Sequence, residues 1–195
     1  SLVCIIMTTG SFVWMICGYR RGYVVTIMMR ISDVCLAFPG LVFALAIAAL
    51  LNGGLVNAVF ALAAISWPKY ARIARSQTLR LKDSDFLAAA KMSGATTAAQ
   101  IWRHILPNAM GPILVTAMLN IGTMMMELAG LSFLGLGAQP PTAELGNMMS
   151  GGRSMLQTYP WVMLAPGAAI LFAVVAFNLL GDAVRDRLDP KNTQR

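Results

Sequence analysis

The side chains best suited to catalysis are few in this chain of 195 residues. His104 is the only histidine, and no Ser, Cys or Asp stands beside it in a pattern typical of a nucleophilic triad. Cys4, Cys17 and Cys35 form no CxxC pair, so they predict no redox or metal framework. The chain also has no GxxxxGKS/T phosphate loop. We therefore predict a non-catalytic protein with no metal site and no cofactor of its own.

Glu127 is the one clear acidic residue inside an apolar stretch, where it follows Met124, Met125 and Met126. A carboxylate within a membrane is costly and often functional. Two readings stay open: Glu127 lines a translocation path and meets an amine-bearing substrate, or it bonds a neighbouring helix near the external interface. Consecutive methionines point in different directions around a helix, so we expect packing and lipid contact from them rather than metal binding. As path residues we predict Glu127, Met124 and Asn178, the last with a hydrogen bond between helices as its alternative.

The composition places these residues in a polytopic membrane protein. Apolar residues make up 57% of the chain and charged residues only 12%, unlike a soluble domain. The turn signal Asn52-Gly53-Gly54 separates two apolar stretches, and a later stretch is expected to break near Gly135 and Gly137. The five predicted spans, judged by apolar length, are 2–17, 34–51, 55–68, 108–137 and 160–181.

Lysine and arginine are concentrated in residues 18–33, in residues 68–104 and in the tail from 182 onward. The positive-inside rule therefore places these segments, the C-terminus included, in the cytoplasm, and the 52–54 turn and the 138–159 loop outside. The net charge of +7 could indicate nucleic-acid binding, but the charges lie at the ends of apolar stretches rather than on one soluble face. We predict an all-α membrane protein of the bacterial inner membrane. Its partners include the lipid bilayer, and we expect it to bind no nucleic acid.

Residues 83–107 have the pattern of two short helices on the cytoplasmic side. Ser84 can cap the first helix, and Gly94 is expected to end it in a left-handed conformation. Thr97 with Gln100 predicts a capping box for the second helix. The apolar side of that helix is expected to face the bundle, and Pro107 is expected to stop the helix before the next span. The residues on that apolar side are Ile101, Trp102, Ile105 and Leu106. From spacing alone, a plain surface loop with good helix signals remains an equal alternative.

The same segment resembles the EAA loop of ATP-binding cassette (ABC) importer permeases. The pattern of that loop is Glu-Ala-Ala, three residues, Gly, nine residues, Ile, one residue, Leu-Pro. Ala89 and Ala90 match the two alanines, Gly94 matches the glycine, and Leu106-Pro107 match the end. The resemblance implies a coupling loop that docks on an ATPase subunit.

Two positions depart from that pattern. Ala88 stands where the motif has Glu, so any salt bridge from that position is in doubt, and His104 stands where the motif has Ile, with Ile105 beside it. The resemblance implies these ATPase-coupling residues: Asp85, Ala88, Ala89, Ala90, Gly94, His104, Ile105, Leu106 and Pro107.

Other stretches are similar to the dipeptide/oligopeptide/nickel branch of these permeases, over residues 19–190. They include Trp67-Pro68-Lys69-Tyr70-Ala71-Arg72, Leu131-Ser132-Phe133-Leu134-Gly135-Leu136-Gly137 and Ala176-Phe177-Asn178-Leu179-Leu180-Gly181-Asp182. The resemblance implies a single type I importer transmembrane domain over 1–195, with 83–107 as its coupling loop. Permeases of this branch have a first span before this point, so we expect the chain to lack that span.

The resemblance also implies the partners and the mode of transport. They are a second homologous permease, two ATPase subunits that bind the ATP, and an extracytoplasmic substrate-binding protein, acting together by alternating access. Peptides and nickel or nickel chelates stay level as substrates. A secondary transporter would need several intramembrane acids in matched repeats, and a non-transporting scaffold would not explain the capped helix pair. These two classes are kept as alternatives.

Overall fold

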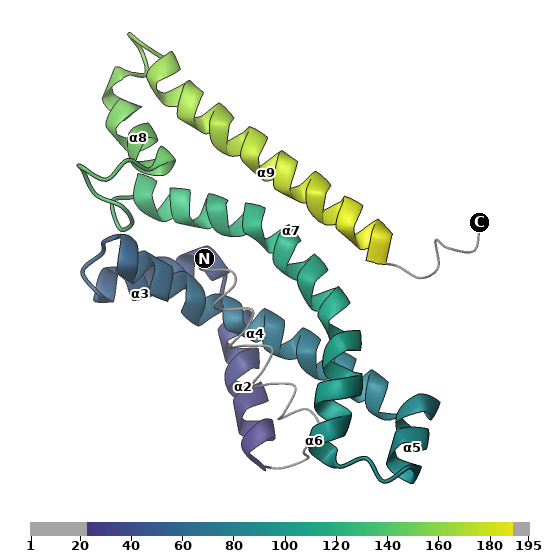
Figure 1. Ribbon diagram of the computed structural model, residues 1–195. Coiled ribbons are helices and arrows are strands. Elements are labelled where there is room, and N and C mark those ends of the chain that lie inside the picture. Colours follow the sequence, from purple (N-terminus) through teal and green to yellow (C-terminus); the bar gives the residue numbers. More distant parts are fainter. Residues whose placement is uncertain (1–22, 189–195) are drawn as a thin grey trace.

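The computed structural model describes residues 23–188, and that part of the chain is helical without a strand. Figure 1 shows the helices in chain order: α2 (Tyr23–Ala37), α3 (Gly40–Leu50), α4 (Leu55–Lys82), α5 (Asp85–Met92), α6 (Thr97–Gln100), α7 (Leu106–Phe133), α8 (Leu145–Gly152) and α9 (Trp161–Leu188). A π-helix over Ile101–Ile105 joins α6 to α7, and a 3-10 helix over Arg153–Met155 follows α8. The predicted all-α class is confirmed for the described residues.

Within residues 23–188, two helices are long and apolar enough to cross a membrane, Thr97–Phe133 and Trp161–Arg187. A third candidate is the pair formed by α2 and α3, which is bent by 99°. α4 joins an apolar first half, the predicted span 55–68, to a basic second half in one continuous helix. The predicted span 2–17 lies outside the described residues, so a count of five spans stays a prediction.

The predicted span 34–51 is not one straight helix. The chain is helical from Tyr23, inside the region predicted as a cytoplasmic loop, and it breaks at Phe38 and Pro39 before α3 begins at Gly40. Proline has no N–H to donate and disfavours helical backbone in the residue before it, so Phe38-Pro39 ends α2 and re-aims the chain. The sequence prediction missed this bend because residues 34–51 were judged by apolar length alone.

Pro107 does not stop the helix, contrary to the sequence prediction. Thr97–Phe133 forms one continuous helix of 37 residues, and Pro107 lies in the first turn of α7. The backbone widens instead, because the N–H of Leu106 donates to the carbonyl of Ile101, five residues back. This wider turn accommodates the missing N–H and the ring of Pro107. The carbonyl of His104 accepts a hydrogen bond from the Asn108 side chain, at 2.7 Å.

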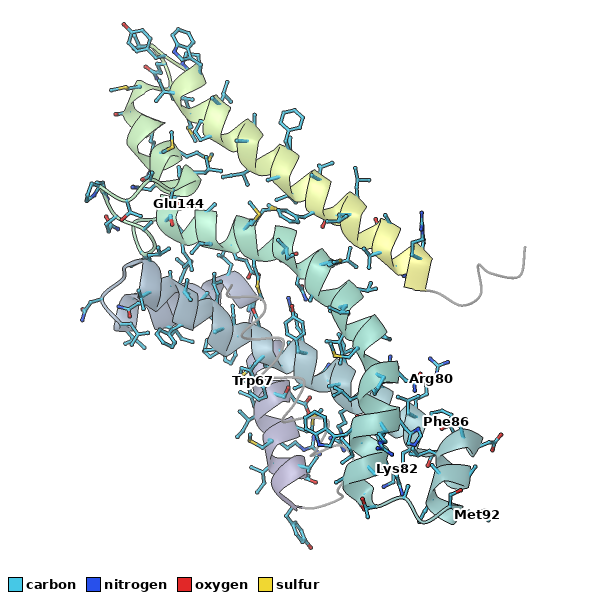
Figure 2. The ribbon with its side chains drawn as sticks, viewed as in Figure 1. Trp67, Arg80, Lys82, Phe86, Met92 and Glu144 are labelled. Carbon is cyan, nitrogen blue, oxygen red and sulfur yellow. The ribbon has the colours of Figure 1, made fainter. Side chains whose placement is uncertain are left out.

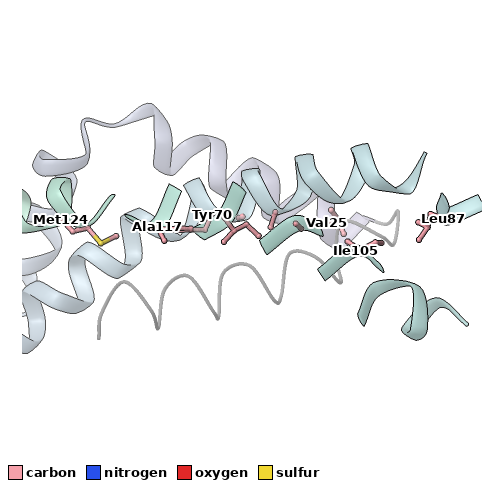
Figure 3. Packing of buried hydrophobic residues seen from close by; sticks show 10 residues of the cluster. Val25, Tyr70, Leu87, Ile105, Ala117 and Met124 are labelled. Atoms are coloured by element: carbon pink, nitrogen blue, oxygen red, sulfur yellow. The ribbon is translucent and has the colours of Figure 1, made fainter. Parts of the chain in front are cut away.

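The hydrophobic core lies mainly between α4 and α7. Figure 3 shows one cluster of buried side chains that extends from Met124 through Tyr70 to Ile105 and Leu87. Tyr70 is fully buried, and its hydroxyl lies 3.3 Å from the Asn120 side-chain amide of α7, which donates to it. Leu87 belongs to α5, so the cluster connects the interior of the bundle to the short helix at its end.

Helices α7 and α9 pack closely through glycine. A Cβ atom added at Gly122 would lie 3.2 Å from the side chains of Val174 and Asn178, and one at Gly181 would lie 2.8 Å from the side chain of Leu119. Small residues let membrane helices approach in this way. Much of α9 remains uncovered within the chain, as expected for a helix that faces lipid or another subunit.

The loops predicted to lie outside the cell gather at one end of the molecule. A Cβ at Gly53, in the α3–α4 turn, would lie 3.5 Å from the backbone of Leu136, which follows α7. α7 ends at Phe133 and Gly135 adopts a positive φ, so the predicted break near this glycine is confirmed. In Figure 1, α8 lies near this end, and α5 and α6 lie at the opposite end.

Gly146→Ala should destabilise the contact between α8 and α7. The added Cβ would lie 2.1 Å from the carbonyl oxygen of Ala129, so α8 would have to move away from α7. We expect the free energy of unfolding to fall by about 1–3 kcal/mol, the usual effect of over-packing. Thermal unfolding of the full-length protein in detergent measures this loss. Gly151→Ala, on the same helix with no atom within 4 Å of the new methyl, should be close to neutral.

Candidate docking site and intramembrane pocket

Helix α5 begins and ends as the sequence predicts, but its cap differs in detail. Ser84 occupies the N-cap position, yet its hydroxyl donates to the carbonyl of Leu81 and accepts nothing from the helix. Asp85 supplies the acidic residue of the first turn, where it favours the helix dipole. Capping by the Ser84 side chain is therefore wrong, although the helix start is right.

Gly94 ends α5 through its backbone conformation. Its φ is +81°, and the N–H groups of Gly94 and Ala95 donate to the carbonyls of Lys91 and Ala90, both at 3.1 Å. These bonds satisfy the free carbonyls at the end of the helix. A Cβ at Gly94 would meet no atom within 4 Å, so the glycine is required for its φ and not for space.

The second short helix is capped one residue earlier than predicted. The hydroxyl of Thr96, not Thr97, accepts a hydrogen bond from the N–H of Ala99, at 3.3 Å. The side chain of Gln100 donates to the carbonyl of Ala95, at 2.8 Å. Only Thr97 has a glutamine three residues later, so the capping-box pattern favoured the wrong one of two adjacent threonines.

α5 is held against the rest of the domain along one side. Leu87 is 3% exposed and Ile105 is fully buried in the same cluster. The ring of Phe86 lies 6.3 Å from the ring of His104, in a tilted contact between α5 and the π-helix. His104 thus has a packing role between the two short helices. Leu106 is half-buried beside it, and Pro107 is exposed.

The other side of α5 forms an exposed face, which we call the docking face. Asp85, Ala88, Ala89 and Met92 are all exposed, while Ala90 is half-buried toward the core. Met92 is 92% exposed, an unusual position for a large apolar side chain. The two alanines leave the middle of this face flat, so a partner can approach the helix closely. Figure 2 shows Met92 and Phe86 near Arg80 and Lys82, far from Glu144 at the other end.

Glu127 lies in a different place, at the inside of the bend between α2 and α3. It lines a pocket of about 240 Å³ together with Cys35, Gly40, Ser66 and Lys69. One carboxylate oxygen of Glu127 would lie 3.8 Å from a Cβ at Gly40, the first residue of α3. The pocket therefore brings an acid from α7 together with a base from α4 and with the start of a helix.

The structure does not bring the three predicted path residues together. Met124 is buried in the core cluster and is 6% exposed, whereas Asn178 is exposed on α9 next to Gly122. Met126, by contrast, lines an apolar pocket between α7, α8 and α9, so neighbouring methionines point in different directions as expected. Lys69 was missed because the positive-inside rule accounts for it as a boundary charge. The Pro39-Gly40 pair was the signal that could have located the bend.

Comparison with known proteins agrees with a helical membrane protein. Residues 10–194 match the family described as binding-protein-dependent transport system inner membrane component. The chain belongs to this family. Members are membrane components of transport systems, so the family and the apolar helices together make this domain a multi-pass membrane subunit.

Curated relatives are similar to this chain over most of the chain's length. A dipeptide transport system permease protein of Alkalihalophilus pseudofirmus is 43% identical over 93% of this chain and 60% of its own. A glutathione transport system permease protein of Pectobacterium atrosepticum is 43% identical, over 95% and 62%. A di/tripeptide transport system permease protein of Pseudomonas aeruginosa is 39% identical, over 98% and 63%. The chain thus spans about three fifths of the length of these relatives.

Proposed function

We propose that this chain forms one permease half of an ABC importer and couples to an ATPase subunit through the docking face of α5. The single observation that carries the proposal is the position of that face. It is exposed and flat, yet the helix behind it is anchored by Leu87 in the core cluster that continues to Met124. A partner that moves α5 would therefore move the packed interior between α4 and α7.

The proposed topology has five spans, with the C-terminus and α5 in the cytoplasm. The basic second half of α4, with Arg80 and Lys82 near α5, supports this orientation by the positive-inside rule. The contact between Gly53 and Leu136 supports placing the α3–α4 turn and the segment after α7 together on the external side. The broken pair α2 and α3 then counts as one span.

The proposed mechanism is alternating access. ATP binding and hydrolysis in two cassette subunits would close and open them, and the docking face would transmit that movement. The helix from Thr97 to Phe133 is continuous through its π-helical turn, so movement at its cytoplasmic end would be passed along it to the interior. A cavity shared with a second permease would open outward and then inward. An external binding protein would deliver the substrate.

Co-purification tests this proposal against a secondary transporter and a scaffold. The full-length permease, expressed with the genes that neighbour it, should bring down an ATPase subunit and a second permease. The purified complex should hydrolyse ATP faster when the loaded binding protein is added. A permease that transports substrate down an ion gradient without any ATPase would contradict the proposal.

For the substrate we propose small peptides. The relatives that carry dipeptide, di/tripeptide and glutathione names support this class over nickel. Calorimetry on the partner binding protein should show tight binding of di- or tripeptides and none of free or chelated nickel. Tight nickel binding without peptide binding would move the assignment to metal uptake.

A further inference from the structure

We propose that the pocket at the α2–α3 bend binds the two charged ends of a small zwitterion during transport, with Glu127 receiving its ammonium group and Lys69 its carboxylate. This inference rests on the proposed function, because it assigns the peptide substrate to a particular place on the path. It joins residues of four elements, since Cys35, Gly40, Lys69 and Glu127 come from α2, α3, α4 and α7.

The first argument is the charge arrangement. Glu127 and Lys69 line one pocket, but the ion pairs of the described residues are Arg30–Asp33 and Arg72–Asp33. The two groups interact through space across the pocket but form no direct salt bridge among the described residues, so a ligand that carries a charge of each sign can lie between them. A zwitterion brings one charge of each sign and satisfies both groups at once. A simple cation or anion would satisfy only one of them.

The second argument is the broken helix. α3 begins at Gly40 with Pro39 as its N-cap, and no side chain caps its first N–H groups. The positive end of α3 therefore faces the Glu127 carboxylate, whose oxygen lies 3.8 Å from the position of a Cβ at Gly40. This end of the helix dipole favours the ionised carboxylate. The start of α3 therefore places partial positive charge on the same wall of the pocket as the Glu127 carboxyl group.

The third argument concerns size and access. The pocket has a volume of about 240 Å³, enough for a small dipeptide with both of its charged ends but not for a long chain. Lys69 and Phe38 are exposed at its edge, and Ser66 and Ile65 are buried at its wall. The pocket is therefore open to a ligand that arrives from outside the domain, and it offers a hydroxyl in addition to the two charges.

Cys35 provides a direct probe, because its thiol lies in the pocket lining. The full-length permease carrying C4S and C17S is assembled with its partner permease and ATPase subunits, without binding protein, in lipid nanodiscs. Cys35 is then labelled with a cationic or an anionic methanethiosulfonate. Alanyl-alanine should slow both reactions severalfold, and the same dipeptide with acetylated and amidated ends should not.

Two variants test the roles of the charges in opposite directions. E127Q should lower the ratio of cationic to anionic labelling by about tenfold, and K69M should raise it by a similar factor, as expected for removing one nearby charge. Both variants should abolish protection by alanyl-alanine. A merely disturbed fold would change both reagents alike in both variants, and that result would overturn the proposal. Equal labelling of the parent with and without dipeptide would also overturn it.

Because the labelling needs no ATP, it tests the zwitterion site independently of coupling to the ATPase. If the complex hydrolyses ATP in response to binding protein but Cys35 is never protected, the zwitterion site is wrong and the importer stands. If Cys35 is protected but the assembled complex does not hydrolyse ATP faster with loaded binding protein, the site stands and the importer proposal fails.

Discussion

Ala89→Trp should weaken the binding of the ATPase subunit to the full-length permease by about tenfold or more. Ala89 lies on the exposed docking face, so the indole would project from the surface and leave the permease fold intact. A partner that packs closely on this face would meet the ring, and over-packing costs roughly 1–3 kcal/mol. The amount of ATPase that co-purifies at limiting concentration, and its rate of hydrolysis, measure the effect.

Met148→Trp provides the matched control for this change. Met148 is also an exposed residue of a short helix, but it lies on α8, at the end that we place outside the cell. We expect normal ATPase binding from it. Equal loss in both variants would mean that the tryptophan acts through general instability and not through the docking face.

Gly94→Val should uncouple ATP hydrolysis from transport while the ATPase still binds. Valine at a φ of +81° is strained by roughly 1–2 kcal/mol or more, so α5 would no longer turn into α6 at the native angle. The docking face itself would be unchanged. In proteoliposomes we expect severalfold less peptide taken up per ATP hydrolysed, with ATPase binding near normal.

Gly111→Val separates this effect from the simple addition of a side chain. Gly111 lies within α7 at an ordinary helical φ, and a Cβ there would meet no atom within 4 Å. Its uptake per ATP should match that of the unchanged protein. Unchanged coupling in the Gly94 variant would show that the fixed angle after α5 does not transmit movement.

Local signals in the sequence predicted the short helices well. Ser84 and Gly94 mark the two ends of α5, because the backbone preferences of residues at helix ends act over only a few residues. The fine details of capping were not predictable, since either threonine can cap a helix and the glutamine that favoured Thr97 bonds the carbonyl of Ala95. The exposed face of α5 followed only once the burial of Leu87 was known.

Longer-range features could not be predicted in the same way. Pro39 ended a helix and Pro107 did not, because the wider turn over Ile101–Ile105 accommodates the second proline. Glu127 was recognised as unusual from its apolar surroundings, but its neighbours Gly40 and Lys69 come from distant parts of the chain. Only the packing of α3, α4 and α7 brings them together.

A site-specific cross-link tests the central claim most directly. The full-length permease with C4S, C17S and C35S carries either M92C, on the docking face, or M155C, next to α8 and 49% exposed in the native protein. A short thiol cross-linker is applied to the assembled complex. We predict a cross-link from M92C to the ATPase subunit and none from M155C. An ATP-hydrolysing complex in which M155C reacts with the ATPase and M92C does not would contradict the proposed docking face and the orientation of the domain.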